Sequence, residues 1–252
     1  MFVSRQDLIF DIGLHKGLDS EFYLNKGFSV VGLEASPDLW DHVRAALEPH
    51  VSSGKLCVVQ KALFHEDDKE VTFFINPDKD DWGSLEQGSA EKGVGHSVSI
   101  TVPTVTLATL FKTYGVPYYL KCDIEGGDAI LAEQLLNSAG RPTFVSLEAT
   151  SADDIAKLVA CGYDRFQLVN QYLNIFVECP EPAREGVYVN SRFSHETSGL
   201  FGKELPPEKW TDFSKTMAMF LDWYSLRERD ANLAVGWLDV HACKSETLTR
   251  GV

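Results

Sequence analysis

Long apolar runs are missing from this sequence. No stretch of the 252-residue chain approaches the roughly 20 apolar residues of a membrane-spanning helix. The opening residues, MFVSRQDLIF, run straight into a strand-like segment and lack the charged and apolar regions of a secretory signal peptide. These two absences predict a cytoplasmic protein with no membrane span.

Basic residues are also scarce. The chain has 23 lysines and arginines against 37 aspartates and glutamates, which gives a formal net charge of −14 and a pI of about 4.9. Such a charge disfavours non-specific binding to nucleic acid or to an anionic membrane. We therefore expect neither nucleic acid nor a membrane as a partner. The sequence is compatible with assembly into a homo-oligomer.

Cysteine is present only as isolated residues. None of the five forms a C-x-x-C pair, and each lies in or beside an apolar stretch. Buried free thiols in a reducing compartment are therefore favoured over a zinc or redox site. Internal repeats and low-complexity tracts are missing too, and the length suits one large domain with an elaborated end.

Strands and helices alternate along most of the chain. Continuous apolar runs such as LIFDI predict strands that are covered on both faces. The expected strands of this kind are residues 8–12, 29–33, 56–60, the first part of 118–128, and 143–150. The expected helices are residues 19–26, 37–47, 129–136, 152–160 and 208–229. This alternation predicts a three-layer α/β sandwich with a mostly parallel sheet.

Other segments depart from that alternation. Residues 66–75 and 96–105 are expected as antiparallel strands, with a polar, glycine-rich and mobile segment between them. Residues 166–171 and 174–179 are expected to form a closing antiparallel hairpin. Residues 180–207, rich in proline and glycine, are expected to be irregular. Ligands of such sheets bind outside the carboxyl ends of the strands, so the chemistry is expected near residues 11–17, 34, 61–63, 123–128 and 148.

The first turn, DIGLHKG, only half matches a dinucleotide fingerprint. Gly13 and Gly17 remain, but the middle glycine of G-x-G-x-x-G is missing and Asp11 precedes the turn. A carboxylate facing the pocket would repel a pyrophosphate and attract a cation, and S-adenosylmethionine carries both an ammonium and a sulfonium. Glu34, at the end of the next strand, is placed to bind a ribose diol. The alternative is a loop glycine pair in some other α/β fold, with Glu34 as a solvated strand end.

Several stretches together resemble the FkbM-type S-adenosylmethionine-dependent methyltransferases. They are DIGLHKG, VVGLEASP, VVQKALF, WGSL, VPTVTL, YYLKCDIEGGD, RPTFVSLE and GYDRFQLVNQ, within residues 8–178. The K-x-D-x-E-G segment at 121–126 is the most specific. The resemblance implies a Rossmann-like class I methyltransferase fold and methyl transfer to an oxygen, often on a sugar, a glycolipid or a secondary metabolite. Leu14 and His15 depart from the family turn, which usually carries a small residue and asparagine there.

These boundaries predict how the chain is organised. Residues 1–179 are expected as the S-adenosylmethionine-binding domain, with a β-rich insert at about 64–105. Residues 180–252 are expected as a C-terminal extension that packs on the same domain. Within it, residues 180–207 are expected to fold over the carboxyl ends of the strands and to help shape the acceptor pocket. The alternative for residues 180–207 is a dimer contact or a linker.

Acidic residues are the first candidates for catalysis. Asp123 and Glu125 follow a strand, and if that strand stays extended both side chains point the same way. Glu148 ends the next strand. These acids are expected to bind the acceptor or act as general base; holding Mg²⁺ is possible chemically but not favoured, so no metal ligand is assigned. The alternative is that Glu125 only caps the following helix.

Histidines and small residues complete the candidates. His15 lies in the cofactor turn, and His195 lies in a glycine-bearing loop as an alternative base; His241 is expected to be a packed histidine. Ala62 follows the third strand, and Ser84 belongs to a loop that is expected to cover the cofactor. The complete set assigned to the cofactor is Asp11, Gly13, His15, Gly17, Glu34, Ala62, Ser84 and Asp123.

Three functions compete. The first is an O-methyltransferase acting on a small-molecule or glycan acceptor, with N- or C-methylation as a near rival because the turn does not specify the acceptor atom. The second is a nicotinamide-dependent dehydrogenase, which the missing glycine and Asp11 disfavour. The third is a cofactor-binding scaffold without turnover, which the intact DIEG segment disfavours. We expect the first.

Overall fold

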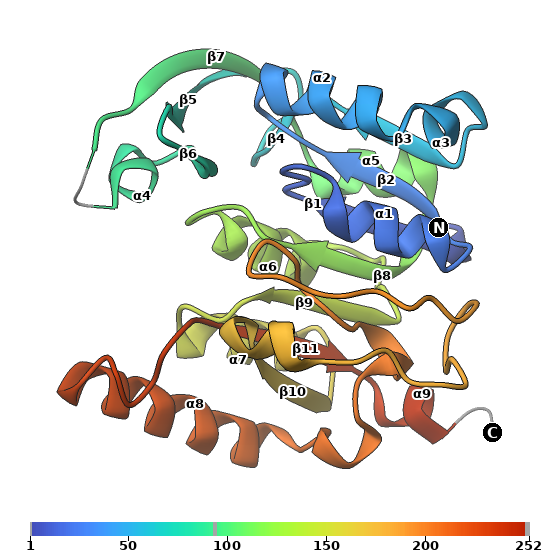
Figure 1. Cartoon of the computed structure of the whole chain (residues 1–252), viewed down its shortest axis with the longest axis vertical. Helices are drawn as coiled ribbons and strands as arrows, with labels where there is room; N and C mark the ends of the chain where they lie inside the picture. The colour runs from blue at the N-terminus through green and yellow to red at the C-terminus, as the bar shows by residue number, and fades with distance from the viewer. Residues whose placement is uncertain (1, 93–94, 250–252) are drawn as a thin grey trace. The chain divides into compact units, whose positions relative to one another are not determined.

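The structure is a computed structural model that describes residues 2–92 and 95–249 (Figure 1). It divides the chain into two compact units, residues 1–142 and 143–252, which are described in turn. Each unit is a set of residues that contact one another more than they contact the rest of the chain. Such a division does not test the predicted functional boundary between residues 179 and 180.

Four parallel strands form the sheet of the first unit, in the order β8-β1-β2-β3. They are β1 (Ser4–Ile12), β2 (Ser29–Leu33), β3 (Leu56–Val59) and β8 (Val116–Cys122). All seven residues of β8 are buried, including Lys121 within its otherwise apolar pattern. In register, Asp11 lies beside Gly32 on one side and Lys121 on the other.

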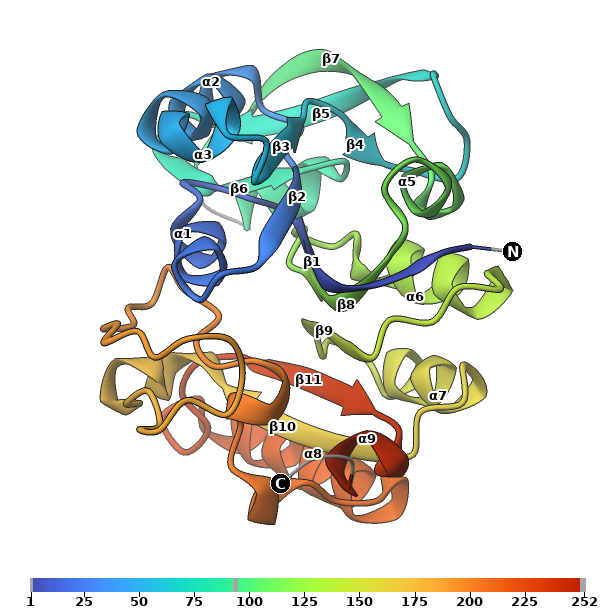
Figure 2. The ribbon, with the colours of Figure 1, turned by 90° about the vertical axis from the view of Figure 1, so that its right-hand side faces the viewer.

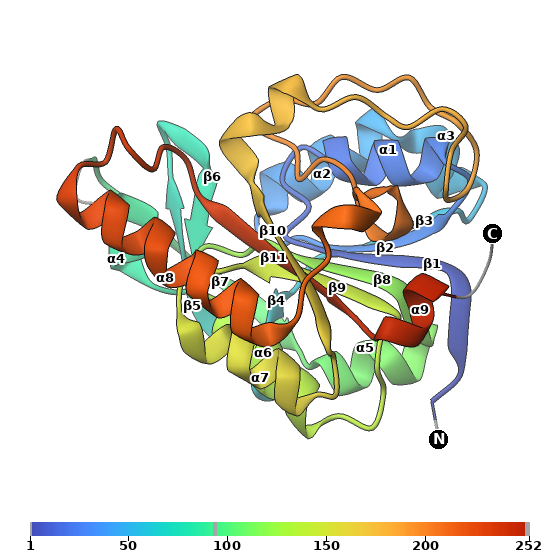
Figure 3. The same ribbon diagram turned by 90° about the horizontal axis from the view of Figure 1, so that it is seen from below.

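Helices cover both faces of this sheet. α1 (Leu18–Asn25), α2 (Pro37–Ala46) and α3 (Glu48–Ser52) lie on one face, whereas α5 (Leu107–Tyr114) and α6 (Asp128–Asn137) lie on the other (Figure 3). The predicted three-layer α/β arrangement is therefore confirmed. The sequence reading missed α5, which begins where the Thr106 side chain accepts a hydrogen bond from the backbone N–H of Thr109, 3.2 Å away.

The insert of the first unit forms a second, smaller sheet with the order β4-β7-β5-β6. Its strands are β4 (Ala62–Leu63), β5 (Glu70–Asn76), β6 (Lys79–Ser84) and β7 (Val98–Val105). β5 and β7 pair antiparallel as predicted. The segment expected to be a mobile loop instead contains β6 and the short helix α4 (Gln87–Glu91). Part of it, residues 93–94, lies outside the described residues.

The second unit contains three strands in the order β10-β11-β9: β9 (Phe144–Glu148), β10 (Arg165–Asn170) and β11 (Leu238–Cys243). β11 pairs antiparallel with both neighbours, and Figure 2 shows it beside β10. The predicted hairpin is wrong, because Gln171–Phe176 is a 3-10 helix. The Asn170 side chain accepts a hydrogen bond from the Tyr172 N–H at 3.0 Å and so begins that helix.

Helices and irregular segments complete the second unit. α7 (Ala152–Ala160) follows β9 as predicted, and α8 (Phe213–Arg229) begins later than expected, after Asp212 caps it. Residues 180–207 are mostly irregular, as predicted, apart from a 3-10 turn at Gly202–Glu204; another spans Pro207–Lys209. The short α9 (Ser245–Thr249) follows β11. None of the described helices is both long and apolar enough to cross a membrane.

The cysteines agree only in part with the expected buried thiols. All five are free, and three of them, Cys122, Cys161 and Cys243, are buried. Cys57 and Cys179 are partly exposed. The structure thus gives no cysteine a disulfide partner.

Candidate functional site

The turn after β1 is built from left-handed backbone. Gly13, His15 and Gly17 have φ angles of 86°, 49° and 78°. A Cβ added to Gly13 would lie 1.9 Å from the Asp123 carbonyl oxygen, so the turn touches the exit of β8. One added to Gly17 would lie 3.2 Å from Val43 of α2. Gly13 therefore permits the turn as expected, and the protein neighbour of Gly17 is α2; close passage of Gly17 to the ligand stays a prediction.

Glu34 joins the same turn to the end of β2. Its carboxylate accepts hydrogen bonds from the backbone N–H of His15 at 2.9 Å and of Ser36 at 2.8 Å. Burial raises the pKa of Glu34 to about 7, although these backbone donors favour the ionised form. The Ala35 N–H is a third backbone donor to this carboxylate, which has about four acceptor sites, so the group still has capacity for a ribose hydroxyl.

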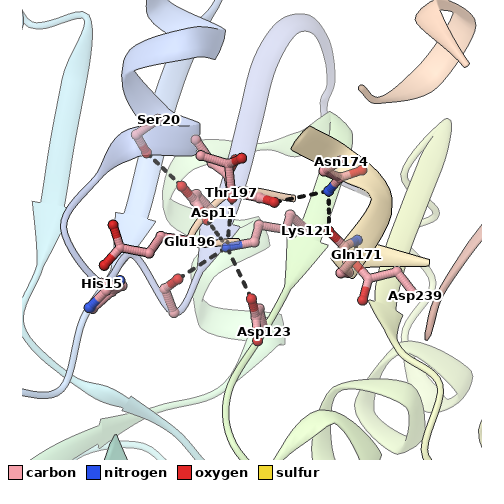
Figure 4. A network of polar contacts seen from close by, with 12 residues as sticks. Asp11, His15, Ser20, Lys121, Asp123, Gln171, Asn174, Glu196, Thr197 and Asp239 are labelled. Carbon is pink, nitrogen blue, oxygen red and sulfur yellow. Dashed lines mark hydrogen bonds and ion pairs between the residues drawn. The ribbon is translucent and has the colours of Figure 1, made fainter. Parts of the chain in front are cut away.

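Asp11 has surroundings different from those expected. The sequence reading placed its carboxylate in an open pocket facing a cation, but the side chain is fully buried. One oxygen accepts a hydrogen bond from the Ser20 hydroxyl at 2.7 Å, and the other lies 3.2 Å from the Lys121 ammonium (Figure 4). The cation that Asp11 attracts is therefore supplied by the protein itself.

Lys121 is the residue that the sequence reading missed. Its ammonium lies 3.2 Å from Asp19, 3.8 Å from Asp123 and 3.3 Å from the carbonyl oxygen of Gly13, to which it donates a hydrogen bond. Burial lowers the pKa of an ammonium, but the three neighbouring carboxylates outweigh that effect and hold the pKa of Lys121 well above its ordinary value. The available signal was a lysine inside an otherwise apolar strand, two residues before Asp123.

The two predicted acids lie in different surroundings. β8 ends at Cys122, and Gly126 turns the chain with a φ of 76°, so the expected extended path through Glu125 is wrong. The Asp123 side chain is 49% exposed, whereas Glu125 is 20% exposed and lies 2.8 Å from the Lys92 ammonium. The N-cap position of α6 is Gly127, two residues after Glu125.

Insert residues hold the turn at 123–127. The Ser84 hydroxyl donates to the carbonyl of Glu125 at 2.6 Å and accepts from the Glu86 N–H at 3.0 Å. A Cβ added to Gly126 would lie 2.8 Å from the Ser89 hydroxyl oxygen. The buried Ser84 therefore shapes the acid-bearing turn, and its predicted role over the cofactor stays a prediction.

Ala62 lies in an apolar cluster of the insert. It is buried in β4 and belongs to a core that also contains Ala35, Phe73 and Val102. Ala35 directly follows Glu34, so Ala62 lies in the same packed cluster as the end of β2. Contact between Ala62 and a cofactor stays a prediction.

The candidates of the second unit have their own partners. The ring of His195 stacks on that of Tyr172, with centroids 4.7 Å apart and planes inclined by 20°. Glu148 ends β9 in register with Asp239. His241 is packed inside β11 as expected, and burial lowers its pKa to about 3, which keeps the ring neutral. A catalytic role for His195 stays a prediction.

The first unit thus brings most of the predicted cofactor residues to the ends of three strands. Asp11, Gly13, His15, Glu34 and Asp123 are linked by the contacts described above. Among the side chains that the structure describes, no group of three or more histidine, cysteine or acidic residues is arranged to hold a metal ion.

Comparison with known protein families gives one match. The profile described as "Methyltransferase FkbM domain" matches residues 11–176, which is more than half of the chain. No curated protein matches the chain significantly.

Solved structures give distant likenesses. Precorrin-6y C5,15-methyltransferase from Geobacter metallireducens GS-15 is 12% identical, with a TM-score of 0.42 over 96% of this chain and 81% of that one. The C-terminal domain of precorrin-6Y C5,15-methyltransferase from Rhodobacter capsulatus is 11% identical, with a TM-score of 0.41 over 94% and 79%. A TehB-like SAM-dependent methyltransferase from Corynebacterium glutamicum is 12% identical, with a TM-score of 0.32 over 65% and 69%. At these scores the likenesses carry no argument about activity.

Proposed function

The chain belongs to the methyltransferase FkbM family and is an S-adenosylmethionine-dependent methyltransferase, and from that premise we propose that it methylates a hydroxyl oxygen. The proposed acceptor is a sugar, a glycan or a secondary metabolite, as the family resemblance implies. One observation supports oxygen as the acceptor atom: the half-exposed carboxylate of Asp123 beside the Gly13 turn. A hydroxyl must lose its proton during methyl transfer, and this carboxylate is available to take it.

The charges around the turn suit the cofactor. Asp11 and Asp123 contact Lys121, so the carboxylates already outnumber the ammonium there, before Asp19 is counted. S-adenosylmethionine carries a positively charged ammonium and sulfonium, and a surplus of negative charge favours such a ligand. Glu34, with its spare lone pairs at the end of β2, is the proposed partner of the ribose hydroxyls.

The chemistry needs alignment and one proton acceptor. The bound cofactor supplies a methyl carbon that is already activated by the positive charge on sulfur. With the cofactor bound, Asp123 would orient the acceptor hydroxyl toward the methyl group and would take its proton as the methyl is transferred, with S-adenosylhomocysteine as the leaving product. Solvent then removes the proton from Asp123, whose side chain is half exposed. The chain's own part is thus to position the reactants and to move one proton.

The test compares the two acids. Asp123→Asn is expected to lower turnover of a true acceptor by about 10²–10⁴, the usual scale for loss of a general base. Glu125→Gln, in which the partner of Lys92 is changed, is expected to lower it far less. Calorimetric affinity for S-adenosylhomocysteine should stay within about threefold in both variants, because neither removes Glu34.

Two outcomes would contradict the proposal. Full turnover by both variants would remove these acids from the chemistry and make His15 or His195 the next base to test. Product analysis that finds the methyl group on nitrogen or carbon would reject oxygen as the acceptor atom.

A further inference from the structure

A single buried cation connects the separate parts of the candidate site. Lys121 has almost no exposed surface, yet its ammonium contacts Asp11 of β1, Asp19 in the first turn of α1, and Asp123 beyond β8. It also donates a hydrogen bond to the carbonyl of Gly13 in the turn. The same atom therefore contacts four segments of the first unit.

Stability alone is a weak reason for such a cation. Taking charges out of water is costly, and an apolar side chain of similar volume often packs in place of a buried ion pair with no loss of stability. The rest of β8 is buried as well. What an apolar residue cannot supply is a hydrogen bond to the Gly13 carbonyl together with an ion pair to Asp123.

The contact with Asp123 is the informative one. Asp11 and Asp19 are almost completely buried and need a counter-charge in any case, whereas Asp123 is 49% exposed and can be solvated without Lys121. The close approach of Gly13 to the Asp123 carbonyl already fixes the backbone there. Lys121 adds a restraint on the carboxylate itself, on the side facing the turn.

We propose that Lys121 is a positioning residue that couples the cofactor turn to the carboxylate of Asp123. This inference rests on the proposed function, in which Asp123 takes the proton from the acceptor. Lys121 holds the Gly13 carbonyl and the Asp123 carboxylate in one arrangement, so that the cofactor and the base are aligned together. A misplaced base is costly, since an error of about 1 Å in a catalytic geometry lowers the rate by about 10²-fold.

The first experiment is a double-mutant cycle on turnover. Lys121→Met is expected to lower kcat by about 30- to 100-fold, and Asp123→Asn by more. If Lys121 acts through Asp123, the double variant turns over no more slowly than Asp123→Asn alone. Lys121→Arg, which keeps the charge, is expected to recover part of the lost kcat. Multiplicative losses in the double variant would overturn the inference.

The second experiment separates positioning from stability. Lys121→Met removes the ammonium that contacts both Asp11 and Asp19, so the variant is expected to melt at a lower temperature. Adding Asp19→Asn removes one of the two buried negative charges and should recover part of that stability, while kcat stays low because Asp123 is still unrestrained. Recovery of kcat together with stability would mean that Lys121 only holds the fold.

Lys26 provides a matched control. It is another buried lysine of the first unit, at the end of α1, with its ammonium 5.6 Å from the Phe22 ring centroid. Lys26→Met is expected to lower the melting temperature but to leave kcat within about twofold, because α1 loses stability without a change at Asp123. A kcat loss equal to that of Lys121→Met would show that any buried lysine has this effect.

A binding measurement makes the result independent of turnover. Lys121→Met is expected to weaken S-adenosylhomocysteine by about tenfold in calorimetry, since the Gly13 turn loses its hydrogen bond. If the affinity of Lys121→Met for S-adenosylhomocysteine is unchanged, Lys121 does not act on cofactor binding through the Gly13 turn. Full turnover by Asp123→Asn would reject Asp123 as the proposed base. If Asp123→Asn instead loses most of its turnover, but the kcat losses of Asp123→Asn and Lys121→Met multiply in the double variant, only the coupling through Lys121 is rejected.

Discussion

Glu34 is a carboxyl group whose burial and hydrogen bonds act in opposite directions. Burial raises its pKa from 4.5 to about 7, while the backbone N–H groups of His15 and Ser36 favour the ionised form. The group therefore holds a proton in the folded chain over a pH range in which it is ionised when unfolded. That difference makes the stability of the protein depend on pH.

The sign of the dependence follows from the raised pKa. Between about pH 4.5 and 7 the folded chain binds more protons at Glu34 than the unfolded chain, so its contribution to stability is present at low pH and is lost as pH rises through this window. We expect the free energy of unfolding to fall by up to about 3 kcal/mol across it from this group. Urea unfolding at several pH values measures the slope, and Glu34→Gln should flatten it. An unchanged slope in that variant would assign the dependence to other groups.

Sequence reading identified most site residues but not their partners. Asp11, Gly13, Glu34 and Asp123 were predicted because each lies where a strand ends, and strand ends follow from the apolar pattern. Lys121 was missed because a strand pattern does not indicate which cation a buried acid will contact. The burial of Asp11 was missed for the same reason, since one carboxylate after three apolar residues fits a pocket and an ion pair equally well.

At the scale of elements, the insert supports the turn that carries the acids. Ser84 ends β6 and donates its hydroxyl to the carbonyl of Glu125. Lys92, at the end of α4 with a φ of 41°, contacts the Glu125 carboxylate and lies 4.9 Å from the Trp82 ring centroid. Two elements of the insert thus restrain one short turn.

Removing the Ser84 hydroxyl should loosen that turn. Ser84→Ala leaves the buried contact of the Glu125 carbonyl unmade, at an expected cost of about 1–3 kcal/mol. Hydrogen–deuterium exchange should accelerate in peptides covering residues 123–127 and leave β1 unchanged. Ser52→Ala, on the exposed helix α3, is the control and should leave the exchange rates of residues 123–127 and of β1 unchanged. Equal exchange in Ser84→Ala and the unmodified protein would mean that the insert does not restrain the turn.

Element prediction succeeded where one pattern dominated. β2 and α7 match their expected bounds because apolar residues recur there at strand or helix spacing. The hairpin after β10 failed because residues 174–179 contain the β-branched and aromatic residues typical of a strand, yet Asn170 caps Gln171–Phe176 as a 3-10 helix. The true partner of β10 is β11, and no local pattern indicates a pairing between segments so far apart in the sequence.

For the molecule as a whole, ligand binding gives the broadest prediction. S-adenosylhomocysteine at about 100 times its Kd should stabilise the folded chain by about 2.7 kcal/mol, which corresponds to a rise in Tm of about 5–10 °C for a protein of this size. NAD at the same concentration should give no rise. Glu34→Ala should reduce the shift, because the proposed ribose contact is lost. A shift with NAD and none with S-adenosylhomocysteine would contradict the cofactor assignment.

The second unit depends on β11. Every residue of this strand is buried, and Val240 lies beside Leu147 of β9 and Leu168 of β10. Val240→Pro removes a backbone donor inside the sheet and should destabilise residues 143–252 by about 3 kcal/mol or more. Exchange in peptides covering β9 and β10 should rise in the variant. Val187→Pro, at an exposed position of an irregular segment, is the control; equal protection in both variants would show that β11 is dispensable.

The position of β11 also affects how the protein is made. β10 ends at Asn170, but the strand that separates it from β9 begins only at Leu238. At about 5–20 residues per second, a ribosome needs about 3–14 s to synthesise the intervening chain. During that interval the flanking strands have open edges where their central partner belongs, and such edges pair readily with other chains. The nascent protein is therefore most exposed to aggregation late in translation, which is when a chaperone that binds strand edges would protect it most.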